Sequence, residues 1–112
     1  MLNMGVIMNL IVDEKAQELI NKLESLNGPI IFYQSFGCCD GSVPLCYAKS
    51  YFTLGSNDVC IATSVNGIEL WTHQSQVDFY KDKTFHLGAE QGMANEYSLE
   101  YEYNMCFVLI LN

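Results

Sequence analysis

Thiol groups are concentrated in one short stretch of this chain. Three of the five cysteines fall within residues 38–46 together with one carboxylate. Zinc and iron prefer thiolate ligands, and a carboxylate can complete or support a four-coordinate shell. The stretch therefore predicts a bound metal, either a zinc ion or iron in an iron–sulfur cluster. The expected ligands are Cys38, Cys39 and Cys46. Asp40 would be a direct or supporting ligand.

The same thiols allow two other functions. One of them could be a nucleophile or redox centre, because backbone N–H groups of a glycine-bearing loop favour a thiolate. Its base would be His73 or His86, the only two imidazoles. Alternatively, the cysteines only pack as small apolar side chains in a structural interaction protein, since neighbours such as Cys38 and Cys39 point to opposite faces of extended backbone. No base is paired with a thiol in the sequence, which favours a non-catalytic metal-binding protein over a thiol enzyme.

The two remaining cysteines lie in apolar runs. Cys60 falls within Val59–Ala62, and Cys106 falls within Met105–Leu111. Free cysteine behaves as a small apolar side chain and is often buried. Both are therefore expected in the core, with Cys106 as a reserve ligand if its strand ends beside the thiol-rich stretch.

The thiol-rich stretch is expected in a loop between two strands. Gly37, Gly41 and Pro44 are turn-forming residues, so residues 36–44 are predicted as a loop. The preceding residues 30–35 are β-branched or aromatic and predict a largely buried strand, and residues 46–54 predict the next strand. Loops held by such a scaffold often carry function.

An amphipathic helix precedes this region. Apolar side chains recur at three- and four-residue spacing and are expected to face the core: Ala16, Leu19, Ile20, Leu23 and Leu26. Asp13 is a typical N-cap residue, and Asn27-Gly28-Pro29 ends a helix. The helix is therefore predicted to run from about residue 13 to about residue 27.

The second half of the chain predicts mainly strands. Expected strands are residues 58–64, 68–72, 84–87, 97–103 and 105–111. Asn66-Gly67 predicts a tight hairpin, residues 75–81 predict a short helix with Val77 and Tyr80 or Phe79 facing inward, and residues 88–95 predict a loop. The expected class is α+β: an N-terminal helix followed by a mostly antiparallel β-sheet or barrel-like sandwich, with one short second helix.

Composition excludes several classes of function. The 112 residues include 5 basic and 13 acidic side chains, for a net charge of −8, and 50% are hydrophobic. Binding to nucleic acid or to an anionic membrane surface would need the clustered Lys and Arg that this chain lacks. Disorder is excluded because so apolar a chain offsets its conformational entropy by burial. The length fits one domain, residues 1–112.

Surface and compartment can also be predicted from composition. Only 16% of residues are charged, well below the roughly 25% that is usual in globular domains, so part of the surface is expected to be covered in a homo-oligomer. Residues 1–12 are apolar but follow no basic residue and offer no small-residue cleavage site. They are also too short to span a membrane, as is the apolar run near the C-terminus. A cytoplasmic location is expected, in which an odd number of cysteines favours thiols or metal ligands over disulfides.

The stretch Gly28–Tyr47 resembles the signature of a family of small bacterial proteins, domain of unknown function 779. Weaker similarity continues through Gly55–Val59, Ile68–Thr72, Gln76–Tyr80 and the residues Tyr97-Ser98-Leu99-Glu100. Tyr33 and Phe36 stand where the family usually has His and Gly. Members are commonly encoded beside aldehyde dehydrogenases, so the resemblance implies an aldehyde dehydrogenase as a partner and aldehyde oxidation as the context.

A second resemblance is at the level of fold only. The order of helix, strand, glycine-bearing cysteine loop, further strands and a late cysteine is similar to the A-type iron–sulfur carriers. Those carriers end in a Cys-Gly-Cys pair, where this chain has Cys106 alone.

Overall fold

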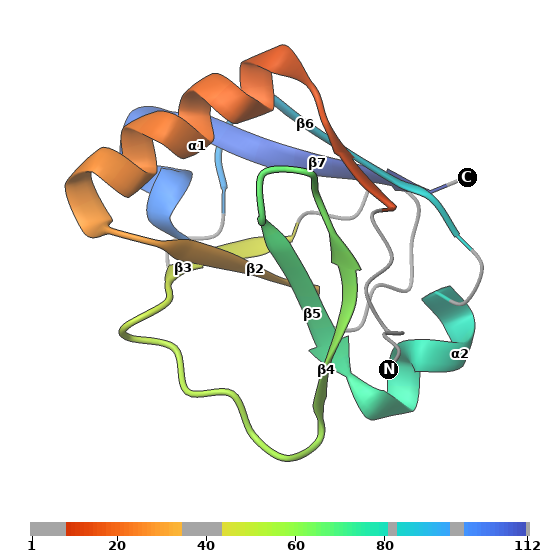
Figure 1. Ribbon diagram of the computed structural model, residues 1–112. Helices are drawn as coiled ribbons and strands as arrows, with labels where there is room; N and C mark the ends of the chain where they lie inside the picture. Colours follow the sequence, from red (N-terminus) through yellow and green to blue (C-terminus); the bar gives the residue numbers. More distant parts are fainter. Residues whose placement is uncertain (1–8, 35–43, 81–82, 95–97, 112) are drawn as a thin grey trace.

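The computed structural model describes residues 9–34, 44–80, 83–94 and 98–111. Within them, the strands are β1 (Leu10–Val12), β2 (Ile30–Gln34), β3 (Leu45–Ala48), β4 (Asp58–Thr63), β5 (Glu69–His73), β6 (Phe85–Gln91) and β7 (Met105–Leu111). The α-helices are α1 (Glu14–Asn27) and α2 (Val77–Tyr80), and the 3-10 helices are η2 (Gln74–Gln76) and η3 (Leu99–Tyr103). The predicted class is confirmed: an α+β protein with an N-terminal helix and one short second helix (Figure 1).

The strands form two mixed sheets. The first sheet has the order β1-β6-β7, and the second has the order β3-β2-β5-β4. Three of the strand pairs are antiparallel, whereas β1 with β6 and β2 with β5 are parallel. Parallel pairs require crossover connections. Helix α1 connects β1 of the first sheet to β2 of the second and packs against β6 of the first sheet (Figure 1).

Helix α1 forms where the sequence predicts it. The Asp13 side chain caps its first turn, accepting a hydrogen bond from the Ala16 backbone N–H at 2.8 Å. Gly28 ends it with φ +78°, and the Gly28 N–H donates to the Glu24 carbonyl at 2.8 Å. The predicted apolar face is buried apart from Leu26, which is 62% exposed at the end of the helix.

One apolar core lies between the two sheets and under α1. Phe32 of the second sheet and Phe107 of the first meet edge to face, with ring centroids 4.7 Å apart. Both rings are almost completely buried, and burying a side chain of this size contributes about 1.5–3 kcal/mol. Ile20 and Leu23 of α1 and Leu70 of β5 join the same cluster. The core thus fixes the two sheets relative to each other.

Three sequence predictions of secondary structure are wrong. Residues 97–103 were expected to form a strand because their polarity alternates, but Leu99–Tyr103 is the 3-10 helix η3, preceded by Ser98 and ended by Asn104 with φ +55°. Strand β6 continues to Gln91 through the glycine-containing segment predicted as a loop, because β7 pairs with it along its whole length. Strand β3 ends at Ala48 rather than at residue 54.

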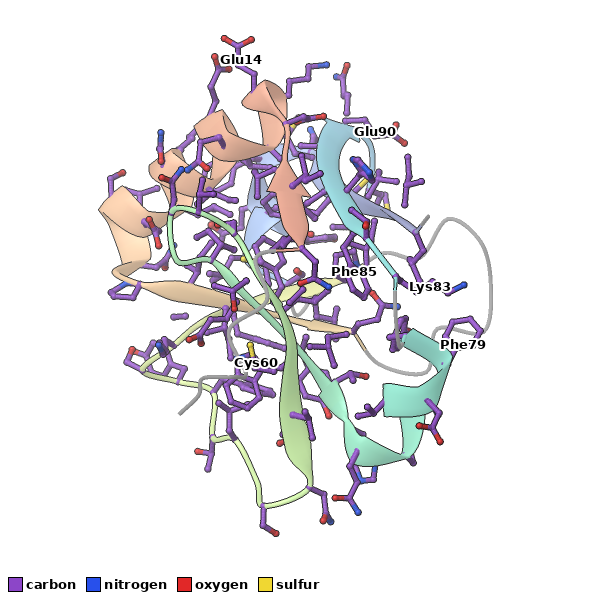
Figure 2. All side chains as sticks on the ribbon, turned by 45° about the vertical axis from the view of Figure 1, so that its right-hand side comes forward. Glu14, Cys60, Phe79, Lys83, Phe85 and Glu90 are labelled. Carbon is purple, nitrogen blue, oxygen red and sulfur yellow. The ribbon has the colours of Figure 1, made fainter. Side chains whose placement is uncertain are left out.

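Other local predictions are confirmed. Gly67 has φ +86° in the tight turn between β4 and β5, where the Ser64 N–H donates to the Ile68 carbonyl at 2.9 Å. In α2, Tyr80 is buried, whereas Phe79 is 56% exposed and projects from the outer side of the helix (Figure 2). Within the described part of the chain, no helix has the length and apolar character needed to cross a bilayer.

Candidate functional site

The thiol-rich stretch connects the carboxyl end of β2 to the start of β3, at the same end of the second sheet. Strand β2 ends at Gln34 and β3 begins at Leu45, and Gln34 is the parallel partner of Thr72 in β5. The Thr72 hydroxyl donates to the Gln34 carbonyl at 2.7 Å, which ties the two strand ends together. Carboxyl ends of parallel strands are a common position for functional groups. Of the predicted ligands, Cys38, Cys39 and Asp40 lie outside the described residues.

A polar group, here called the outer cluster, lies on the solvent side of the second sheet, near the carboxyl ends of β2 and β5. It consists of Tyr33, Gly55, Asp58 and His73. The Tyr33 hydroxyl donates to Asp58 Oδ1 at 2.6 Å, and the Gly55 N–H donates to Oδ2 at 2.7 Å. Asp58 and His73 are directly opposite each other on β4 and β5.

The outer cluster stabilises a charged carboxylate. The hydrogen bond from Tyr33, then that from Gly55, and finally the charge of His73 lower the pKa of Asp58. Burial, the hydrogen bond to Asp58 and the negative charge of Asp58 together raise the pKa of Tyr33 to about 12. Tyr33 is therefore a hydrogen-bond donor and not a base at neutral pH.

The two imidazoles are in different environments. His73 Nδ1 accepts a hydrogen bond from the Ser75 backbone N–H at 3.1 Å, so the neutral ring carries its proton on Nε2. In that tautomer His73 has no free nitrogen for a metal. His86 lies in β6 of the other sheet, opposite Ile11 and Ile110. Neither described environment pairs an imidazole with a thiol.

Cys46 is the one predicted ligand that the structure describes. Its side chain is completely buried on the core side of β3, where Cys46 pairs with Phe32 of β2. Burial raises the pKa of the Cys46 thiol well above its usual value, and the charges of Glu100 and Glu24 add to the shift. Without a cation, this thiol is neutral at physiological pH.

A second polar group, here called the inner cluster, surrounds Cys46. It consists of Cys46, Ser98 and Glu100. Strand β3 is at the edge of its sheet, and the Cys46 N–H donates to Ser98 Oγ at 2.7 Å instead of to another strand. The Ser98 hydroxyl in turn donates to Glu100 Oε1 at 2.5 Å. All three residues are at most 3% exposed.

Glu100 is the least expected member of the inner cluster. It is completely buried between β3 and β7, although Glu is rarely buried without a partner. Burial raises its pKa, while hydrogen bonds from Ser98 and from the backbone N–H groups of Glu100 and Phe107 act in the opposite direction without cancelling the shift. Its Oε2 atom has no hydrogen-bond partner within the described part of the chain.

The other two cysteines differ in exposure. Cys106 is buried, as predicted, and burial and the charges of Glu90 and Glu100 raise its thiol pKa. Cys60 was predicted to be in the core, but it is exposed on β4 (Figure 2). The reason is that β4 is an edge strand, with Cys60 on its solvent side and Ala62 facing the core after a register shift between them.

The described residues do not form a complete metal site. Among residues 9–34, 44–80, 83–94 and 98–111, no three His, Cys, Asp or Glu side chains are grouped so that they could hold an ion. Cys46 and Glu100 could supply one sulfur and one carboxylate oxygen. A complete shell would need further ligands from elsewhere in the chain.

The sequence pattern does not indicate Ser98 and Glu100 as site residues. Their alternation with apolar residues predicts a half-exposed strand, which places Glu100 in solvent. A different signal was available: Ser98 is a typical N-cap residue, and Asn104 is a typical residue for a left-handed helix end. A helical interpretation puts Glu100 and Tyr103 on one face.

Comparison with known proteins gives one result. Neither a curated protein nor a solved structure matches this chain significantly. The family model described as Domain of unknown function (DUF779) matches residues 19–111, which includes every element from within α1 to β7. The chain therefore belongs to the DUF779 family.

Proposed function

We propose that this protein is a non-catalytic accessory protein that binds a zinc ion or iron, the latter in an iron–sulfur cluster. The proposed ligands are Cys38, Cys39 and Cys46, with Asp40 as a direct or supporting ligand. The main support is the inner cluster: Cys46 is the last cysteine of the thiol-rich stretch, and Ser98 links it to the buried carboxylate of Glu100, which has no cationic partner among the described residues.

The electrostatics of Cys46 support a cation more than a reactive thiol. A nucleophilic cysteine needs a lowered pKa and access to solvent, whereas Cys46 has a raised pKa and is buried. A divalent ion reverses this situation, because it neutralises the thiolate and the nearby carboxylate at the same time. The buried environment then strengthens the attraction.

Elemental analysis tests the proposal. The full chain is purified without chelator and without oxygen, and its zinc, iron and copper contents are measured. We expect close to one equivalent of zinc, or about two or four equivalents of iron for one cluster, and Cys38→Ser or Cys39→Ser should lower the metal content. Cys60→Ser is the matched control, because Cys60 is exposed on an edge strand. A wild-type content below about one tenth of an equivalent would contradict the proposal, given the tight binding of structural metal sites.

The competing function is a thiol-based redox protein or enzyme. It predicts metal-free protein in which Cys38 or Cys39 reacts quickly with iodoacetamide at neutral pH. The third possibility, a structural interaction protein, predicts metal-free protein in which the thiols are slow to react and their replacement changes stability only. Metal content and alkylation rate together separate the three functions.

We also propose that the protein forms a homo-oligomer through the outer face of the first sheet. Ile11, His86 and Ile110 lie side by side across its three strands, and the two isoleucines are 50% and 57% exposed. They border a shallow hollow of about 310 Å³. Ile110→Glu should reduce the mass measured by light scattering to that of the 12.7 kDa monomer. Val65→Glu, at an 81% exposed turn position, is the control.

The family resemblance supports an aldehyde dehydrogenase as the partner of this accessory protein. Co-purification of the metal-loaded protein with an aldehyde dehydrogenase would test this. An interaction that is equally strong with the Cys38→Ser and Cys39→Ser proteins would separate partner binding from metal binding.

A further inference from the structure

We propose that the Glu100 carboxylate binds, through Oε2, the same cation that Cys46 binds. This inference rests on the proposed metal centre and names a ligand that the sequence pattern does not indicate. It is carried by three features of the inner cluster in the described part of the chain: Glu100 has no cationic partner, its Oε2 atom has no hydrogen-bond partner, and Ser98 links it to Cys46.

Glu100 has no cationic partner in the described part of the chain. An ionised carboxylate in an apolar interior is costly unless it is paired with a charge or coordinates a metal. Two of the described lysines are engaged elsewhere: Lys49 pairs with Glu69 at 3.6 Å, and the Lys22 ammonium lies 4.3 Å from the Tyr103 ring centroid. Within the described residues, the charge of Glu100 is therefore left to a proton or a bound cation to balance.

The two carboxylate oxygens of Glu100 are in different situations. Oε1 accepts the Ser98 hydroxyl hydrogen bond at 2.5 Å, whereas Oε2 is buried and has no hydrogen-bond partner within the described residues. An oxygen held by a hydrogen bond while its neighbour is left open is the usual arrangement of a metal-binding carboxylate, where the hydrogen bond fixes the orientation of the ligand.

Ser98 connects this carboxylate to the proposed metal centre. Its Oγ accepts from the Cys46 N–H at 2.7 Å and donates to Glu100, so that β3 and η3 are joined at the level of Cys46. Glu100 is also near enough for its charge to act on the thiols of Cys46 and Cys106. A cation beside Cys46 would therefore experience the Glu100 charge directly.

A hollow lies beside the inner cluster. Ser98 and Leu99 line this space of about 570 Å³ between η3 and the end of α1, where Leu26 and Asn27 form the other side. Cys46 and Glu100 do not line the hollow, so it borders the inner cluster only at Ser98. On binding, the ion would replace the proton of the Cys46 thiol, which leaves to solvent.

Metal titration of the full chain tests the inference, with Co²⁺ as a spectroscopic probe and Zn²⁺ in competition. Glu100→Gln keeps the shape and the acceptor for Ser98 but removes the charge. We expect it to weaken Zn²⁺ affinity by about tenfold or more, without lowering the unfolding midpoint of the metal-free protein. Glu102→Gln is the matched control, because Glu102 lies two residues away in η3 and is exposed. It should bind like wild type.

Each outcome decides between the hypotheses. If wild type binds metal and Glu100→Gln binds it equally well, Glu100 is not a ligand and the metal centre remains. If wild type binds neither ion, both proposals fail. Should Glu100→Gln not fold, X-ray absorption of zinc-loaded wild type still decides: we expect an oxygen scatterer at about 2.0–2.2 Å beside sulfur at about 2.3 Å. A shell of sulfur alone would overturn the inference.

Discussion

The outer and inner clusters place two carboxylates in similar hydrogen bonds with opposite results. Asp58 accepts from the Tyr33 hydroxyl at 2.6 Å, and Glu100 accepts from the Ser98 hydroxyl at 2.5 Å. Yet the pKa of Asp58 is lowered, whereas that of Glu100 is raised. The difference is hydration: Asp58 lies at the solvent side of a sheet edge, and Glu100 lies between two sheets. Hydrogen bonds therefore set the direction of the pKa shift of the hydrated Asp58, whereas desolvation sets the direction for the buried Glu100.

This comparison also separates two kinds of function. The outer cluster stabilises a permanent negative charge at neutral pH and needs no further partner. The inner cluster has a thiol whose pKa is raised well above its usual value and a carboxyl group whose pKa is also raised, and both are potential ligands for a cation. The inner cluster, whose carboxylate has no cationic partner among the described residues, is therefore a better candidate for ion binding than the outer cluster, whose carboxylate is already held by hydrogen bonds.

The largest expected effect concerns thiol access. Cys60 is exposed near the outer cluster, and Cys46 is completely buried in the inner one. In metal-free native protein, Cys46 should be alkylated at least about a hundredfold more slowly than Cys60, because it reacts only after opening of the fold. Peptide mapping by mass spectrometry after timed iodoacetamide treatment measures both rates. Similar rates for the two thiols would show that the inner cluster is open to solvent.

Removal of the Ser98 hydroxyl should destabilise the fold. Ser98→Ala leaves the Cys46 N–H without its acceptor and removes the hydrogen bond to Glu100, and an unsatisfied buried polar group costs about 1–3 kcal/mol. Urea denaturation of the metal-free protein measures the loss. In the control, Ser25→Ala removes an exposed hydrogen bond to the Lys22 carbonyl and should change stability by no more than about 0.5 kcal/mol. Equal effects would mean that burial of Ser98 has no energetic consequence.

Replacement of Glu100 should change the pH dependence of stability. Because its folded pKa is raised, the folded metal-free protein binds a proton that the unfolded chain has lost. The favourable contribution is complete below the unfolded pKa, about 4.3, and is lost as pH rises through the folded pKa. Wild type should therefore lose stability over that interval, and Glu100→Gln should lose less. Identical denaturation curves across pH 4–8 for the two proteins would refute this.

The smallest effect is expected at Tyr33. Tyr33→Phe removes the hydrogen bond that contributes most to the lowered pKa of Asp58. Since that pKa is lowered, its contribution to stability is present above the unfolded pKa, about 3.9, and is lost as pH falls through the folded value. In Tyr33→Phe, the carboxyl signal of Asp58 in an NMR titration should move toward higher pH. An unchanged titration midpoint would show that Gly55 and His73 suffice.

Local elements of this fold could be predicted from sequence because their determinants are local. Asp13 and Gly28 mark the ends of α1, Gly67 marks the turn between β4 and β5, and the apolar run of Met105–Leu111 becomes β7. Each depends on the backbone preference of a few neighbouring residues. The composition and charge of the chain likewise bound its possible functions without reference to a structure.

Pairing and burial were decided only by the tertiary structure. The alternation around Glu100 fits a strand equally well until η3 is packed against β3 and β7, and that packing is what removes water from its carboxylate. Cys60 lies in an apolar run, yet it faces solvent because β4 is the last strand of its sheet. Sequence fixes which groups can ionise or bind metal, but the charge each group carries depends on solvent exclusion by residues distant in the chain.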